Sequence, residues 1–167
     1  MGSVTTVPCA GCGGAFADVD GPVHRYMTSS PGCWRGFGEI LAADYTTPER
    51  MAFHQVVVDA YAAQHPGSGA LPQQVQSVGL HLMTLCLFLD SGTDPSLGTA
   101  LHRRMVDRPV FRRLERSGPG SSTWAGVAAA DGVEDARSAA YAWARDVWET
   151  YRGEHATVRA WLREAGF

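Results

Sequence analysis

The chain has 167 residues and a mass of 17.9 kDa, a length typical of one domain. Its formal net charge of −3 gives no strong basic field, so we expect no nucleic acid or anionic membrane as a partner. All 14 basic residues are arginine, and the absence of lysine excludes a Walker-A loop and a pyridoxal Schiff base. No segment approaches the roughly 18 apolar residues of a membrane span, and no signal peptide is recognisable, so the cytoplasm is the expected compartment.

Two compositional regions follow one another along the chain. Residues 1–33 are rich in Gly, Cys, Pro and Ser, and their only expected regular structure is a small hairpin between Gly14 and Tyr26. Residues 34–167 repeat apolar side chains at spacings of three and four, which is typical of helices. A segment as short as 1–33 cannot bury a core of its own. We therefore predict a mainly α fold, a bundle of about five helices on which an N-terminal zinc knuckle docks within a single globular unit.

A proline that follows a capping residue marks the start of several expected helices. Ser30-Pro31 and Thr47-Pro48 are the clearest examples, because the side-chain oxygen caps the helix and proline suits its first turn. The most apolar of the expected helices is the third, which should be the central buried one. The expected helices span residues 31–45, 48–64, 72–89, 95–106 and 133–165, with a loop over 107–132 and a bend at Gly153.

The N-terminal cysteines have the spacing of a metal site. Cys9 and Cys12 form a C-x2-C-G knuckle, which lets two thiolates reach one tetrahedral ion. Cys33 lies in the first turn of an expected helix, where the helix dipole favours the thiolate. His24 lies between them, so the expected zinc ligands are Cys9, Cys12, His24 and Cys33. The fourth position stays open, because His54 or water could replace His24, and iron could replace zinc.

Other interpretations of the cysteines are weaker. A redox pair would follow a strand in a βαβ pattern that the sequence lacks, and unligated cysteines are the remaining alternative. Pro8 and the knuckle match half of the zinc deaminase signature, but no histidine is followed two residues later by the glutamate which that chemistry needs. Cys86, inside an apolar run, is expected to be a small buried hydrophobic residue.

Histidines on the expected helices form a second candidate group. His54, Tyr61 and His65 project near one helical face, whereas Asp59 lies off that face and should meet solvent, an arginine or a histidine. His81 lies on the apolar helix. In one interpretation these are core histidines with ordinary hydrogen bonds. In the other, His54, His81 and either His65 or His155 line a pocket as metal ligands or as acid/base groups for a small-molecule substrate. The candidate catalytic residues are then His54, Asp59, Tyr61, His65 and His81.

The remaining histidines and the arginines are less informative. His155 falls on the apolar stripe of the last helix, whereas His102, which precedes Arg103 and Arg104, is expected to be solvated. The arginines between residues 103 and 116 form either a solvated face or a patch for a phosphate or an acidic partner.

Four ordered segments carry a family resemblance. They are CAGCG at 9–13, SSPGCW at 29–34, DAYAAQHP at 59–66 and QSVGLHL at 76–82. This set resembles a family of bacterial proteins of unknown function, best known from actinobacteria, over about residues 9–90. The resemblance implies no activity. It implies that the cysteines and histidines form one unit with further polar residues, which are Asp59, Tyr61, Gln64 and Gln76.

Two classes of function follow. The first is a small metal-dependent enzyme, in which zinc activates water or a carbonyl and His54 or His81 acts as acid/base beside Asp59 or Tyr61. The second is a non-catalytic interaction or regulatory protein whose zinc is structural. An open coordination position beside a polar pocket would favour the enzyme, and a closed Cys3His site would favour the second class. The number of polar groups on apolar helix faces narrowly favours the enzyme.

Overall fold

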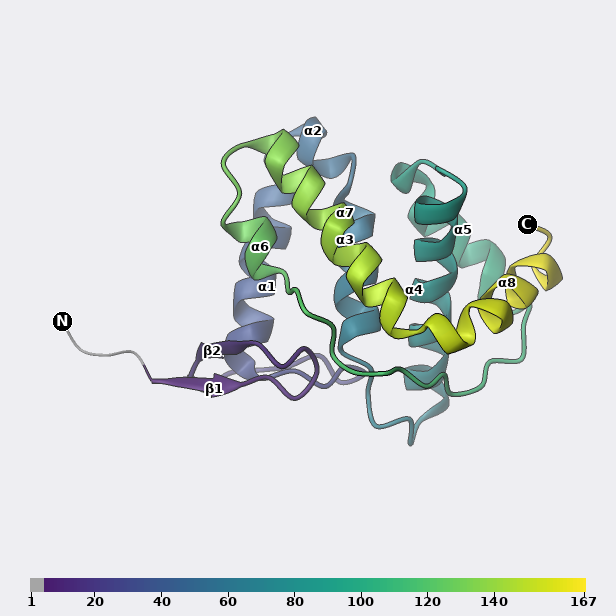
Figure 1. Ribbon diagram of the computed structural model, residues 1–167, viewed down its shortest axis with the longest axis horizontal. Helices are drawn as coiled ribbons and strands as arrows, with labels where there is room; N and C mark the ends of the chain where they lie inside the picture. The colour runs from purple at the N-terminus through teal and green to yellow at the C-terminus, as the bar shows by residue number, and fades with distance from the viewer. Residues whose placement is uncertain (1–4) are drawn as a thin grey trace.

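The computed structural model describes residues 5–167 and is mainly helical, as the sequence predicts (Figure 1). A small antiparallel sheet consists of strands β1 (Thr6–Pro8) and β2 (Ala15–Ala17). The helices are α1 (Pro31–Asp44), α2 (Pro48–Met51), α3 (His54–Gln64), α4 (Pro72–Asp90), α5 (Gly98–Met105), α6 (Ala125–Ala128), α7 (Val133–Thr150) and α8 (His155–Glu164). Short 3₁₀ turns at Pro95–Leu97 and Arg152–Glu154 precede α5 and α8.

Helix α3 packs against both α4 and α7 and forms the centre of the bundle (Figure 1). Its Val56 and Ala60 are completely buried. On α7, Ala136, Ala140 and Ala144 repeat every four residues and are also completely buried, which allows the two helices to approach closely. Because α3 is buried on most sides, its sequence has little amphipathic contrast. This is why the sequence points to α4, rather than α3, as the central helix.

The expected helix over 48–64 is two helices. Thr47 caps α2 as predicted, and its side chain accepts a hydrogen bond from the Arg50 amide. The chain then leaves the helical conformation at Phe53, whose φ is −120° and ψ is 7°. The Phe53 ring is buried in the core, and α3 begins directly after it. The long loop also differs slightly from expectation, since α6 forms one turn within 107–132.

The N-terminal hairpin lies earlier in the chain than the sequence suggests. Strand β2 pairs backward with β1, with Val7 opposite Phe16, so the C-x2-C-G knuckle is itself the hairpin loop. Gly13 in that loop has a φ of 74°, a conformation that favours glycine. Strand β2 packs against the start of α1, where a Cβ on Gly32 would collide with the Ala17 carbonyl oxygen.

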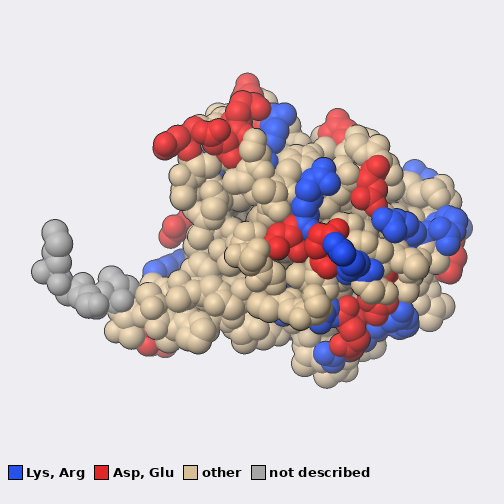
Figure 2. Space-filling view, viewed as in Figure 1, with Lys and Arg blue, Asp and Glu red and all other residues tan. Residues whose placement is uncertain are grey.

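Charged groups of both signs lie on the surface of the helical part. On the face shown in Figure 2, acidic and basic side chains are interleaved over the helical part. Three arginines of the 103–116 segment bind within the protein: Arg112 pairs with Glu154, and Arg113 and Arg116 donate to backbone carbonyls. Within residues 5–167, no helix combines the length and the apolar character that crossing a membrane requires.

Candidate functional site

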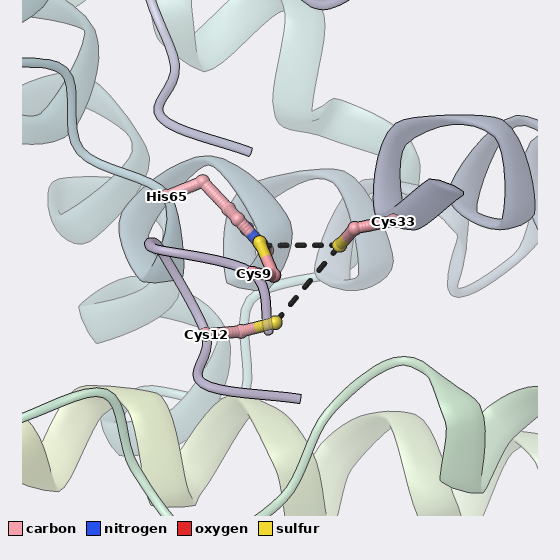
Figure 3. Close-up of side chains that lie close together, drawn as sticks. All are labelled: Cys9, Cys12, Cys33 and His65. Atoms are coloured by element: carbon pink, nitrogen blue, oxygen red, sulfur yellow. Dashed lines mark hydrogen bonds between the residues drawn. The ribbon is translucent and has the colours of Figure 1, made fainter. Parts of the chain in front are cut away.

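Three cysteines and one histidine lie close together at the loop of the N-terminal hairpin (Figure 3). Cys9 and Cys12 come from the hairpin loop, Cys33 from the first turn of α1, and His65 from the residue that ends α3. Their ligand atoms all lie within 4.8 Å of one another, and all four residues are buried. We call this group the Cys3His cluster. It could hold a metal ion.

The spacing of the ligand atoms fits tetrahedral zinc. Around an ion with Zn–S bonds of about 2.3 Å and Zn–N bonds of about 2.0–2.1 Å, neighbouring ligand atoms are roughly 3.6–3.8 Å apart. The Cys12 and Cys33 sulfurs are 3.9 Å apart, and Cys33 Sγ lies 3.4 Å from His65 Nε2. The cluster therefore needs only small shifts to surround one ion.

Hydrogen bonds orient the His65 ring and supply donors to two of the cysteine sulfurs. Nδ1 of His65 lies 2.8 Å from the Tyr61 carbonyl oxygen, so Nδ1 donates its proton there and Nε2 is the ring atom that faces the sulfurs. The Ser30 amide donates to Cys9 Sγ at 3.4 Å, and the Trp124 indole N–H donates to Cys33 Sγ at 3.3 Å. Donors of this kind stabilise thiolates, the form of cysteine that binds metals.

The cysteines and the histidine of the cluster shift one another's pKa values. Hydrogen bonds from Cys12 and Cys33 lower the pKa of the Cys9 thiol, whereas the neighbouring sulfurs of Cys33 and Cys9 raise that of Cys12. Burial lowers the pKa of His65, but hydrogen bonds to Cys33 and Cys9 outweigh this effect and raise the value to about 9. Three buried thiolates repel one another, and a divalent cation would remove that repulsion.

The close packing of the hairpin loop depends on Gly11. A Cβ at this position would collide with the Thr28 carbonyl oxygen and with the imidazole ring of His65. Arg116 also binds this loop. Its guanidinium donates to the carbonyl oxygens of Gly11 at 2.9 Å and of Gln64, at the end of α3, at 2.8 Å. A residue far along the chain thus ties the knuckle to the end of α3.

The side chain of Gln64 is completely buried and binds the segment between α5 and α6. Its amide nitrogen donates to the carbonyl oxygens of Pro119 at 2.7 Å and Ser122 at 2.8 Å, and its amide oxygen accepts from the Trp143 indole at 2.9 Å. All of its polar atoms are therefore engaged. The connection between α5 and α6, which crosses the front of the molecule in Figure 1, is anchored beside the Cys3His cluster.

The fourth side chain of the cluster is His65 rather than His24, which corrects the ligand set expected from spacing. His24 lies instead against Tyr26 and Trp34, at ring-centroid distances of 5.4 and 5.6 Å. The physical reason is at the end of α3, where Pro66 forces the preceding residue out of the helix. The imidazole of His65 consequently turns toward the hairpin.

A second group of polar side chains joins α3, α4 and α5. Asp59 is completely buried, and its Oδ1 lies 2.6 Å from His81 Nδ1 and 3.7 Å from His102 Nε2. Gln55 also donates to Oδ1, at 2.7 Å, whereas Asp59 Oδ2 has no hydrogen-bond partner within residues 5–167. We call Asp59, His81 and His102 the histidine–aspartate cluster. It pairs Asp59 with a histidine, one of the alternatives expected from the sequence.

The other candidate residues lie apart from one another. Nδ1 of His54 is 3.1 Å from the buried Asp44, which also faces Arg50. The hydroxyl of Tyr61 reaches Cys33 Sγ at 3.5 Å, so Tyr61 belongs to the surroundings of the Cys3His cluster. His155 stacks on Trp148 and faces no pocket with the others. The five candidate catalytic residues therefore do not form one constellation.

Cys86 is buried, as expected, at 4 % exposure. Burial, together with the Asp90 carboxylate, raises the pKa of its thiol to about 11. Cys86 belongs to neither cluster and remains a protonated thiol at neutral pH.

Two histidines lie in clusters where the sequence did not place them: His65 was a candidate catalytic residue but not a metal ligand, and His102 was in neither candidate group. His65 was placed on a helical face, although its position before Pro66 is a signal that it leaves the helix. His102 was expected to be solvated, but its side chain is only 22 % exposed and faces Asp59 and Thr84. The signal for His102 was its place beside Leu101 and four residues after Gly98, on the face of α5 that is buried.

Comparison with known proteins identifies a family, but the function of that family is unknown. No curated protein and no solved structure matches the chain. A family model matches residues 7–152, which include the Cys3His cluster and the histidine–aspartate cluster. The chain therefore belongs to the DUF5946 family, a family of unknown function.

Proposed function

We propose that the protein binds one zinc ion through Cys9, Cys12, Cys33 and His65, and that this zinc is structural. The observation that carries the proposal is the convergence of four buried ligand atoms from three separate segments within 4.8 Å. Three sulfurs and one imidazole nitrogen in tetrahedral arrangement are a ligand set that favours zinc over harder ions.

The burial of the cluster favours a structural role over catalysis at the metal. Cys9, Cys12, Cys33 and His65 are exposed by 1 %, 4 %, 0 % and 0 %, respectively. With four protein ligands, zinc has no open position for water or substrate. The enzyme hypothesis, in which zinc itself activates water or a carbonyl, is therefore less well supported than structural zinc.

The proposed zinc would join parts of the chain that otherwise share little apolar surface. Strands β1 and β2 contain three residues each, and a hairpin of that size is not stable alone. The zinc would link the hairpin loop to the start of α1 and the end of α3. It would thereby supply the stabilisation that the N-terminal segment cannot obtain from a core of its own.

Elemental analysis combined with X-ray absorption at the zinc edge tests the proposal. Protein purified without added metal should contain about one zinc per chain, with a first coordination sphere of three sulfurs and one nitrogen. A coordination sphere of two sulfurs with an exchangeable light ligand would contradict a closed structural site.

A pair of histidine variants identifies the fourth ligand. His65→Ala should lose most of the bound zinc, whereas His24→Ala should retain it, because His24 lies outside the cluster. Loss of zinc from the His24 variant alone would refute the proposed ligand set.

A further inference from the structure

An open groove lies beside α4, outside the Cys3His cluster. Its volume is about 550 Å³, a size that suits a small molecule. Its walls come from α1, α3 and α4 and from His24, Tyr26 and Met27. Trp34, Phe37 and Leu80 are among the apolar side chains. None of its lining residues is Arg, Lys, Asp or Glu. The groove is therefore suited to an uncharged, largely apolar ligand.

His81 presents a hydrogen-bond acceptor to this groove. Its Nδ1 lies 2.6 Å from Oδ1 of Asp59, a carboxylate that can only accept, so the ring proton sits on Nδ1. Nε2 then carries a free lone pair, and it has no hydrogen-bond partner within residues 5–167. A buried carboxylate that fixes the tautomer of a histidine is the arrangement of a general base and its orienting group.

His24, on another wall of the groove, presents a donor. Its Nδ1 accepts a hydrogen bond from the Tyr26 amide at 3.2 Å, so the proton of the neutral ring is on Nε2. Burial lowers the pKa of His24, which favours the neutral ring. The groove thus offers one acceptor and one donor between aromatic walls.

We propose that the groove binds a neutral aromatic alcohol, whose hydroxyl donates to Nε2 of His81 and whose oxygen accepts from Nε2 of His24. His81 is placed to act as a general base. When it takes the proton, the O–H bond breaks, an N–H bond forms at Nε2, and the electron pair stays on the ligand oxygen. The hydrogen bond from His24 then stabilises that oxygen.

Asp59 acts in this site as a positioning residue. The imidazolium formed at His81 would face the Asp59 carboxylate, whose second oxygen, Oδ2, is buried and has no hydrogen-bond partner within residues 5–167. A buried carboxylate with an unsatisfied oxygen is stabilised by a positive charge beside it. The Asp59 carboxylate therefore orients the His81 ring and faces the charge that the proposed proton transfer would place on it.

A metal ion in the histidine–aspartate cluster is the competing explanation. The ligand atoms lie within 4.8 Å of one another. However, ligand atoms around one ion are about 2.9 Å or more apart for bonds of 2.0–2.1 Å. The 2.6 Å between Asp59 and His81 is instead a hydrogen-bond distance, and His102 Nε2 is already 3.1 Å from the Thr84 hydroxyl. The geometry favours the proton-transfer pair.

The test uses 2-naphthol as the probe and the zinc-loaded, ¹⁵N-labelled protein. Titration should give saturable changes in the imidazole ¹⁵N resonances of His81 and His24, with the His81 change centred on Nε2. His81→Gln and His24→Gln should each raise the dissociation constant at least tenfold. His155→Gln is the matched control, since His155 lies outside the groove, and should leave the constant unchanged.

The Asp59→Asn variant distinguishes an effect on the orientation and tautomer of the His81 ring from a general loss of stability. An asparagine can donate to Nδ1, which would move the ring proton of His81 to Nε2 and exchange the two ¹⁵N signatures. Binding of 2-naphthol should weaken at the same time, with zinc content unchanged.

Two results would overturn the proposal. One is the absence of saturable resonance changes at His81 and His24 in the wild-type protein, a measurement that does not depend on any variant folding. The other is a second metal ion per chain that disappears in His102→Gln, which would assign the histidine–aspartate cluster to metal binding. Neither result bears on the zinc proposal, which has its own test by metal content and coordination.

Discussion

The two histidine-containing clusters differ in how deeply their side chains are buried. In the Cys3His cluster every ligand is buried, and the segments that supply them are short turns and helix ends. In the histidine–aspartate cluster only Asp59 is completely buried, while the His81 and His102 side chains are 16 % and 22 % exposed on the surfaces of two helices. Complete burial with four soft ligands suits a metal that holds the chain together. Partial exposure beside a groove suits proton transfer from a bound molecule.

The comparison also shows why apolar packing is not enough for the N-terminal segment. The helical part buries large side chains such as Trp143 and Tyr151, whereas the hairpin contributes mainly its cysteines to the core. A segment that buries sulfur ligands instead of large apolar side chains should depend on the metal far more than the helices do.

The largest expected effect is on Cys33→Ser. This variant should lose nearly all bound zinc, and its free energy of unfolding should fall by more than about 3 kcal/mol, because structural zinc contributes about 10–16 kcal/mol in zinc-finger peptides. Zinc content and denaturant unfolding measure the two effects. Cys86→Ser is the matched control: it also alters a buried cysteine, but it should keep its zinc because Cys86 lies outside the cluster. Equal zinc loss in both variants would contradict the assignment.

Gln64→Leu should be the next most severe change. It removes the partner of the Trp143 indole and of the carbonyl oxygens of Pro119 and Ser122, so we expect a loss on the order of 3 kcal/mol. Hydrogen exchange should become faster around residues 117–124, while zinc remains bound. Gln73→Leu, at an exposed position on α4, should change stability by less than about 0.5 kcal/mol. Loss of zinc from the Gln64 variant would mean that the two features are not separable.

Gly11→Ala should weaken the contact between the hairpin loop and His65. Its Cβ would collide with the Thr28 carbonyl oxygen and the His65 ring, at a cost of about 1–3 kcal/mol and with faster zinc loss to a chelator. Gly38→Ala is the control within α1, where a Cβ meets no atom within 4 Å. That substitution should instead stabilise the protein by about 0.5–1 kcal/mol. Thermal unfolding of both variants would show whether the two substitutions act in opposite directions.

The smallest expected effect is the pH dependence of the Arg112–Glu154 pair, which belongs to neither cluster. The hydrogen bond from Arg112 lowers the pKa of the Glu154 carboxyl in the folded protein. Its stabilisation is therefore present above the unfolded value of about 4.3 and is lost as the pH falls through the lower folded pKa. Because the Arg112 side chain is 55 % exposed, the contribution should be at most about 1 kcal/mol. Unfolding of the wild type and Glu154→Gln from pH 3 to 7 should show their difference shrinking below about pH 4; a pH-independent difference would contradict this origin.

Local signals in the sequence predicted much of the fold. The capping oxygen of Ser30 accepts a hydrogen bond from the Cys33 amide, as expected for a helix that starts at Pro31. The break at Phe53 was not predictable in the same way, because it follows from the burial of one ring in the tertiary core. The division of the chain at residue 33 stays a prediction.

The residues of the candidate sites were also predictable only where local spacing, rather than tertiary packing, brings them together. Short spacing brought Cys9 and Cys12 together, and the helix start placed Cys33 near them. Spacing alone then suggested His24, because it lies between the cysteines in sequence. His65 is 32 residues beyond Cys33, and only the packing of α3 against the start of α1 brings the two together. His102 meets Asp59 by the same kind of long-range contact between helices.

The most direct measurement of the central claim is NMR spectroscopy of the protein with zinc replaced by ¹¹³Cd. Scalar coupling from the metal to side-chain protons identifies each ligand individually. Our account predicts coupling to the Hβ protons of Cys9, Cys12 and Cys33 and to the imidazole protons of His65, with none to His24. Coupling to His24 in place of His65, or to fewer than three cysteines, would contradict it.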